Sequence, residues 1–306
     1  MVNYQSVSSQ IESLSENAFI VWPLNKIIAQ LKNKVPLLEK CVAITIDDAY
    51  VSIYEKAFPL LKRHGWPFTV FVATEAVDKG YREMLSWEQM REMAESGGAF
   101  AGHTDTHAYL LRKTGNETEP QWESRITEDI KKSFTRIHDE LGTASTLFAY
   151  PYGEYNLSIK KIVTDLGLTG FGQQSGPAWN GIDFGVVPRF ALAAGYAEMN
   201  GFIIKVNSLP LQVLSVSPED PVVFGNDPHP VLRLTLSDGA YSQESLSCFL
   251  SGHGTISLNW VDKERGIVEV VSNKPLPEGR NRYNFTALHT DGTRYFWYSH
   301  LWIHSH

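Results

Sequence analysis

The sequence predicts an α/β fold with a parallel β-sheet, followed by a small antiparallel β-sandwich. Between residues 42 and about 211, short apolar runs alternate with longer amphipathic segments, which is typical of strands connected by helices. After this region the helical patterns stop, and short β-type runs are separated by Asp-Gly, Gly-His-Gly and Pro-rich turns. The alternating pattern leaves open whether the parallel sheet stays open or closes into a barrel.

Periodicity and end signals predict each element of the first region. Gly65 ends one helix after a basic turn, and Ser86 with Gln89 has the form of a capping box at the start of another. The expected strands cover residues 42–46, 68–72, 99–102, 147–150 and 168–171. The expected helices cover residues 52–64, 86–96, 122–141 and 157–166.

The second region is predicted to be a small accessory domain. Its expected strands cover residues 231–236, 255–260, 267–271 and 295–302. Three prolines mark a linker between the two regions, at Pro210, Pro218 and Pro221. We therefore expect one domain over residues 1–212 and a second, Ig-like β-sandwich over residues 213–306.

Composition argues against some classes of function. Of the 306 residues, 43% are hydrophobic and 20% charged, which suits a globular protein with a substantial core. The net charge of −7 and the lack of a long basic run argue against a nucleic-acid partner. The sequence contains no apolar stretch of about 18 residues, so it predicts no transmembrane segment. Cys41 and Cys248 are expected to be buried free thiols.

Two adjacent carboxylates, Asp47 and Asp48, follow the first predicted strand, in the sequence Thr-Ile-Asp-Asp-Ala-Tyr of residues 45–50. Neighbouring side chains of a continuing strand point to opposite faces, but a turn can bring both to one site. Taken alone, the pair is best interpreted as a solvated turn that leads into the next helix.

A second motif makes a metal site the better interpretation. Residues 102–107 read Gly-His-Thr-Asp-Thr-His, so His103 and His107 are four residues apart and would face the same side of a helical turn. Two imidazoles and one carboxylate, with positions left open for water, are typical of a catalytic zinc site. This pair occurs at a strand end, two strands after the two aspartates.

A third motif follows the predicted strand at residues 147–150. Residues 149–153 read Ala-Tyr-Pro-Tyr-Gly, which alone indicates only a Pro-Gly turn. If this motif lies beside the other two, its backbone N–H groups could stand next to the metal and donate hydrogen bonds to an oxyanion.

Together, the three motifs resemble those of the NodB-homology polysaccharide deacetylases, carbohydrate esterase family four. The family's Thr-Phe-Asp-Asp-Gly is matched by residues 45–49, its His-Ser/Thr-x-x-His by residues 103–107, and its Arg-x-Pro-Tyr-Gly partly by residues 149–153. The motifs stand in family order, and the resemblance spans roughly residues 42–190. Within the family, the sequence resembles the PgaB- and IcaB-like group, which acts on poly-N-acetylglucosamine.

The resemblance implies a distorted (β/α) barrel of about seven strands with the site at its C-terminal rim. Carried over to this sequence, Asp48, His103 and His107 would bind one divalent metal ion, and Asp47 would be the general base. The backbone N–H of Tyr152 would stabilise the oxyanion. Zinc is the expected ion because two nitrogens and one carboxylate suit it, with cobalt or nickel as alternatives.

The sequence departs from the family pattern in two places. The family arginine that pairs with the base is Ala149 here, and Arg189 is either its replacement or a member of an ordinary surface ion pair. The family's late histidine, which protonates the leaving amine, has no counterpart between His138 and His229. The acid could come from the second domain, from a neighbouring subunit or from Asp183, or it could be absent.

Aromatic residues near the motifs are candidates for sugar contacts, although most aromatic residues fill cores. The candidates are Tyr50, Trp87, Tyr109, Tyr152 and Trp179. Trp87 stands at a helix start and has a core position as its alternative. His300, His304 and His306 are expected to lie in a frayed, solvated C-terminus rather than in a second metal site.

The resemblance implies a metal-dependent hydrolase that removes acetyl groups from N-acetylglucosamine units of an acetylated glycan. The alternatives are an O-acetyl esterase acting on xylan or a similar glycan, and a carbohydrate-binding protein without activity. The family setting favours a periplasmic or secreted protein. The N-terminus lacks a basic and apolar leader pattern, so a cytoplasmic location stays open, as does the oligomeric state.

Overall fold

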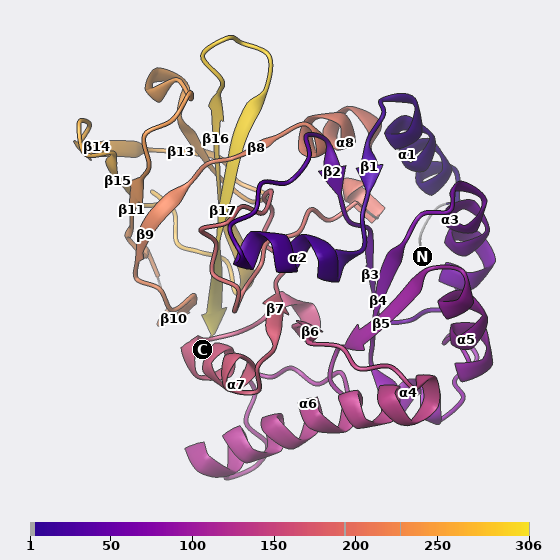
Figure 1. Ribbon diagram of the computed structural model, residues 1–306. Helices are drawn as coiled ribbons and strands as arrows, with labels where there is room; N and C mark the ends of the chain where they lie inside the picture. Colours follow the sequence, from indigo (N-terminus) through magenta and orange to yellow (C-terminus); the bar gives the residue numbers. More distant parts are fainter. Residues whose placement is uncertain (1–3, 193, 227, 306) are drawn as a thin grey trace.

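The computed structural model describes residues 4–192, 194–226 and 228–305. Its first part contains a five-stranded parallel sheet whose strands lie side by side in sequence order. The sheet is an open half-barrel (Figure 1), and a separate pair of parallel strands, β1 and β2, brings this part to the expected seven. The strands are β1 (Ile20–Val21), β2 (Cys41–Val42), β3 (Thr45–Asp47), β4 (Phe68–Val72), β5 (Gly98–Gly102), β6 (Leu147–Ala149) and β7 (Thr169–Phe171).

Helices cover both faces of this sheet, with α2 on one side and α3 and α5 on the other (Figure 1). The capping box expected at Ser86 and Gln89 is present at the start of α5. The helices of the described chain are α1 (Tyr4–Glu16), α2 (Leu24–Lys32), α3 (Phe58–His64), α4 (Thr74–Asp78), α5 (Trp87–Glu95), α6 (Glu119–Leu141), α7 (Leu157–Asp165) and α8 (Met199–Val206).

Strand β4 shows how two-sided burial arises from the sequence. All of its side chains are buried, and they alternate between two clusters. Phe68, Val70 and Val72 pack with residues of α3 and α5, whereas Phe71 faces the other way and packs with Leu24 and Ile28 of α2. A parallel sheet covered on both faces needs such continuous apolar strands.

The C-terminal part consists of two mainly antiparallel sheets with a common core. One sheet has the order β10-β17-β16-β12-β13, with β8 also paired to β17, and the other has the order β14-β15-β11-β9. The strands are β8 (Leu209–Pro210), β9 (Val213–Ser217), β10 (Val222–Phe224), β11 (Leu232–Leu236), β12 (Ser247–Leu250), β13 (Gly254–Ile256), β14 (Leu258–Asp262), β15 (Ile267–Val270), β16 (Gly279–Leu288) and β17 (Tyr295–Ser305).

Strand β17 belongs to two cores at once. Trp302 is fully buried between the two C-terminal sheets. Its neighbours Leu301 and Ile303 point to the opposite face, where they pack with Phe148 and Tyr150 of the α/β part. Because side chains alternate along a strand, β17 ties the two parts of the chain into one packed unit.

The structure corrects several details predicted from the sequence. The predicted helix 52–64 begins as a π-helical turn, Ile53–Ala57, before α3. The single strand expected over residues 255–260 is two strands, β13 and β14, in different sheets. Pro210 lies in β8 rather than in a free linker. Helices α1, α2, α4 and α8 were not predicted.

The C-terminal histidines are ordered parts of β17, so the expectation of a frayed end is wrong for those that are described. His300 and His304 are buried, and both ring nitrogens of His304 face backbone carbonyl oxygens, at 2.9 and 2.7 Å. His306 lies outside the described residues. Cys41 and Cys248 are free, the first half-buried and the second buried. None of the helices in the described ranges is long and apolar enough to cross a membrane.

The close packing of β5 on α6 gives a test of the fold. A Cβ at Gly102 would lie 2.5 Å from the ring of Phe134, so Gly102→Ala overpacks this contact. We expect the unfolding free energy to fall by about 1–3 kcal/mol, measured by urea denaturation. Gly195→Ala, at a position with no atom within 4 Å, is the control and should change it by less than about 0.5 kcal/mol. Equal effects of the two changes would contradict the packing.

Candidate metal centre

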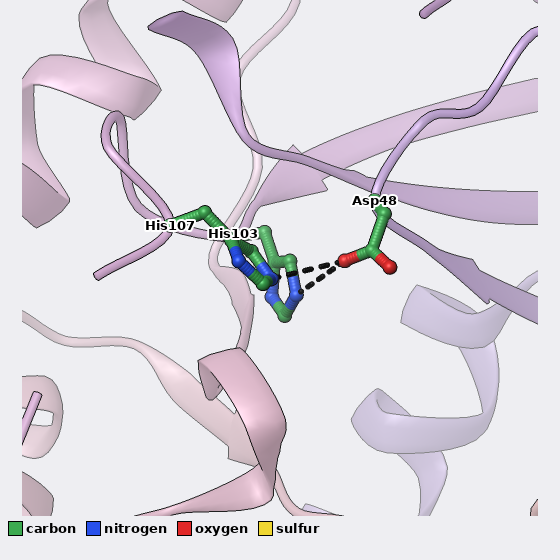
Figure 2. A group of neighbouring side chains, drawn as sticks. All are labelled: Asp48, His103 and His107. Carbon is green, nitrogen blue, oxygen red and sulfur yellow. Dashed lines mark ion pairs between the residues drawn. The ribbon is translucent and has the colours of Figure 1, made fainter. Parts of the chain in front are cut away.

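Three side chains that follow two strands of the parallel sheet converge on one point (Figure 2). Asp48 comes directly after β3 and His103 directly after β5, and His107 lies in the next loop. The Nε2 atoms of His103 and His107 lie 3.3 and 3.0 Å from the same oxygen, Oδ1 of Asp48. One candidate ligand atom from each residue lies within 4.8 Å of the other two.

A loop brings the two histidines together, so the expectation that they share a helical turn is wrong. Thr104 and His107 both have left-handed backbone conformations, with φ of 62° and 56°. The hydroxyl oxygen of Thr104 accepts a hydrogen bond from the N–H of His107 at 2.9 Å. The resulting tight turn leaves the two imidazole rings with centroids 4.9 Å apart. Left-handed non-glycine residues cost about 1–3 kcal/mol each and cluster at functional sites.

The end of β3 separates the two adjacent aspartates. Asp48 and Ala49 are left-handed, with φ of 72° and 60°, so the chain turns sharply after Asp47. The Asp48 carboxylate faces the histidines, whereas that of Asp47 faces Arg189. The turn therefore gives the two carboxylates different partners.

A backbone contact fixes the ring of His103. Its Nδ1 lies 2.7 Å from the carbonyl oxygen of Ala149, in a buried position. A carbonyl oxygen can only accept, so Nδ1 carries the proton, and in the neutral ring Nε2 presents a lone pair toward Asp48. Ala149, which stands where the family has its arginine, thus contributes to the site through its backbone.

Asp47 and Arg189 form a bidentate ion pair. Nη1 of Arg189 donates to Oδ1 of Asp47 at 2.7 Å, and Nη2 donates to Oδ2 at 2.9 Å. The side chains are only 22% and 14% exposed, so this is not an ordinary surface pair. Burial raises the pKa of Asp47, but the charge and hydrogen bonds of Arg189 outweigh it, and the net effect lowers the pKa.

A pocket of about 230 Å³ opens over the three converging side chains. Tyr50 stands at its edge with 49% of its surface exposed. The ring of Tyr152 stacks on that of Tyr109, with centroids 3.9 Å apart and planes 3° from parallel. The lining residues are Asp48, Tyr50, His103, His107, Tyr152, Gln173 and Arg280.

Three residues proposed from the sequence, Trp87, Trp179 and Asp183, do not line this pocket. Trp87 packs against the α3–α5 side of the core and donates its Nε1–H to Asp78 at 2.9 Å. Trp179 and Asp183 line a separate crevice of about 330 Å³ beside the C-terminal sheets. Asp183 pairs there with Lys160, 2.8 Å away.

Comparison with known proteins identifies the domain that carries this site. Residues 34–171 match the family model described as polysaccharide deacetylase. These residues belong to the polysaccharide deacetylase family. The match contains all three candidate ligands and the Tyr152 turn, whereas Arg189 and the C-terminal sheets lie beyond it.

Relatives of this deacetylase domain include poly-β-1,6-N-acetyl-D-glucosamine N-deacetylases. The one of Escherichia coli K12 is 27% identical over 231 residues, 63% of this chain and 34% of that protein. The one of Staphylococcus epidermidis is 33% identical over 162 residues, 51% of this chain and 55% of that protein. The structure of IcaB from Ammonifex degensii is 25% identical with a TM-score of 0.57, over 65% of this chain and 88% of that one. The chain thus spans only part of these two curated relatives.

The donor set of the deacetylase domain fits a divalent metal ion. In a neutral His103, the lone pair of Nε2 would point at a carboxylate oxygen of Asp48. Two such electron-rich atoms attract each other only when a proton or a cation lies between them. Tetrahedral zinc, with bonds of about 2.0–2.1 Å, separates two of its ligand atoms by about 3.3 Å. The separations of 3.3 and 3.0 Å from the Asp48 oxygen agree with this.

Sequence reasoning missed the residue that holds the histidine loop, Asp105. Its carboxylate is buried, accepts a hydrogen bond from the Thr74 hydroxyl at 2.6 Å and pairs with Lys132 at 2.6 Å. Its backbone N–H donates to a carboxylate oxygen of Asp129. The only signal in the sequence was a charged residue between two candidate ligands.

We expect Asp105→Asn to weaken zinc binding about 10–100-fold although Asp105 is not a ligand. The amide keeps the shape but loses the ion pair with Lys132, so the loop that orients both histidines is held less firmly. Zinc affinity is measured by titration against a competing chelator. Asp139→Asn, an exposed α6 position, is the control. Unchanged affinity in Asp105→Asn would contradict this role.

We expect Arg189→Ala to lower the unfolding free energy at pH 7 by about 2–3 kcal/mol, since Asp47 loses its cation in a partly buried site. The pKa of Asp47 is lowered in the folded state, so this stabilisation is present above the unfolded pKa of about 4 and is lost as pH falls through the folded pKa. The difference from wild type should therefore shrink between pH 5 and pH 3, as measured by urea denaturation. The control is Arg91→Ala, which removes a more exposed pair with Glu140. A pH-independent difference would contradict the assignment.

Proposed function

We propose that this protein is a metal-dependent deacetylase that removes acetyl groups from N-acetylglucosamine units of a glycan. One observation carries the proposal: a carboxylate and two imidazoles converge at the bottom of an open pocket, beside a second carboxylate held by an arginine. The family membership of residues 34–171 supports the reaction class. The names of the relatives support the amide of N-acetylglucosamine as the bond broken.

Asp48, His103 and His107 would hold the metal ion. When bound there, the ion supplies Lewis-acid chemistry, which polarises a carbonyl group and makes water more acidic. The donor set favours zinc, and cobalt or nickel could use the same ligands. Burial raises the pKa of Asp48, but its interactions with His103 and His107 outweigh this effect, so the pKa stays well below its ordinary range and the ligand is ionised.

Asp47 is the general base in this proposal. Its pairing with Arg189 keeps the carboxylate ionised at neutral pH, so it is ready to take a proton from the attacking water. The same pairing makes Asp47 a weaker base, because a lower pKa means a lower affinity for the proton. Arg189 thus makes the ion pair with the base that the family's arginine, which is Ala149 in this sequence, would otherwise make.

Tyr152 provides the oxyanion donor. Its backbone N–H makes no backbone hydrogen bond within the described ranges, and its left-handed conformation, with φ of 60°, places it at a sharp turn on the pocket wall. An N–H held in this way is available to the oxygen that becomes negative when water attacks the acetyl carbonyl. The rings of Tyr50, Tyr109 and Tyr152 are the proposed contacts for the sugar.

A second candidate function is supported by the described pocket lining, which offers no further histidine to protonate the leaving amine. Its described histidines are the two proposed ligands, and the guanidinium of Arg280 does not give up its proton. Ester leaving groups need protonation less than amines do. This favours an O-acetyl esterase on xylan or a similar glycan as the alternative. Either polymer favours a location outside the cytoplasm.

We expect the chelated protein to release no acetate. After zinc is restored, the protein should release acetate faster from N-acetylglucosamine oligomers than from acetylated xylan. Asp47→Asn should lower kcat about 100–10,000-fold, since it removes the proposed base. Asp183→Asn, in the separate crevice, is the control and should not. The reverse substrate preference would establish the esterase. A stoichiometric metal without release from any substrate would favour a binding protein.

A further inference from the structure

The C-terminal sheets contribute one side of the metal-site pocket. Among the described pocket residues, Arg280, the second residue of β16, is the only one from these sheets. Its Nη1 donates a hydrogen bond to the backbone carbonyl oxygen of Tyr152 at 2.7 Å, across 128 positions of sequence. The guanidinium carbon also lies 5.6 Å from the centroid of the Tyr152 ring.

Tyr152 therefore lies between a candidate metal ligand and Arg280. Its ring meets His107 edge-on, with centroids 4.7 Å apart, and stacks face to face on Tyr109. Its backbone is left-handed, which is unfavourable for a tyrosine and needs support from its surroundings. The charge-assisted hydrogen bond from Arg280 supplies this support at the carbonyl.

Two contacts hold Arg280 in place. Nε lies 3.6 Å from Oε1 of Glu154, whose side chain is only 11% exposed. In the β16–β17 register Arg280 stands opposite Ile303, which packs with Tyr150 in the core of the α/β part. The docking of β17 therefore sets where Arg280 reaches the pocket.

We propose that Arg280 is a positioning residue for the proposed deacetylation, which fixes the Tyr152 turn so that its N–H and ring keep their places in the pocket. This inference rests on the proposed function. It makes the C-terminal sheets part of the catalytic unit rather than an independent accessory module.

The test compares Arg280→Ala with Arg294→Ala in the zinc-loaded full chain. Arg294 is a matched control, because its side chain is also 37% exposed and it also pairs with the α/β part, at 3.5 Å from Glu39. We expect Arg280→Ala to lower kcat about 10–100-fold, as for loss of one charge-assisted hydrogen bond, with KM changed less than about threefold. Zinc stoichiometry should be unchanged. Arg280→Lys should recover part of the rate, and Arg294→Ala should behave as wild type.

A second measurement does not depend on activity. Hydrogen exchange of residues 150–156 in the metal-free protein should be faster in Arg280→Ala and unchanged in Arg294→Ala. Wild-type kcat and unchanged exchange in Arg280→Ala would overturn the positioning role, as would equal losses in both variants. Failure of the proposed function is distinct, since wild type itself would then release no acetate while the exchange comparison still reports on Arg280.

Discussion

The arrangement of the molecule depends on the two-sided burial of β17. Trp302 fills the space between the C-terminal sheets, while Leu301 and Ile303 cover apolar residues of β6 and its neighbours. Burying side chains of this size contributes about 1.5–3 kcal/mol each, so neither core is complete without the strand. Through its pairing with β16, the same strand brings Arg280 to the pocket. Packing far from the chemistry thus shapes the site.

At the site itself, the strand ends of a parallel sheet bring carboxylates and imidazoles together at one edge. Residues with left-handed backbone conformations turn the chain there and set the directions of these side chains. Asp48, Thr104, His107 and Tyr152 all have positive φ. Each conformation is unfavourable for its residue type, and hydrogen bonds from neighbouring groups offset part of the cost. The contacts of Thr104 with His107 and of Arg280 with Tyr152 are two such bonds. The surroundings therefore hold a geometry that the local chain would not adopt alone.

Periodicity predicted the ends of the strands of the parallel sheet to within three residues, helped by the burial on both faces that makes β4 and β6 apolar. The three metal-ligand candidates were predictable because they stand in short motifs. Arg189 was a candidate because the family resemblance implies a cation beside Asp47 and Ala149 cannot supply it, but an ordinary surface ion pair was the alternative. By contrast, Arg280 lies 128 positions from Tyr152, and no local pattern encodes a contact made by sheet docking. The role of Asp105 likewise depends on Lys132 and Thr74, which only the fold brings near.

The order in which these residues occur along the chain has a consequence for synthesis. Asp48, His103 and His107 lie within a span of 60 residues, and they follow β3 and β5, which flank β4 in one sheet. The ribosome makes this span well before it makes Arg189 and β16, and domains generally begin to fold as they emerge. In a nascent chain the three candidate ligands can therefore come together early, whereas the Tyr152 side of the pocket is complete only after residues 279–305 have been made.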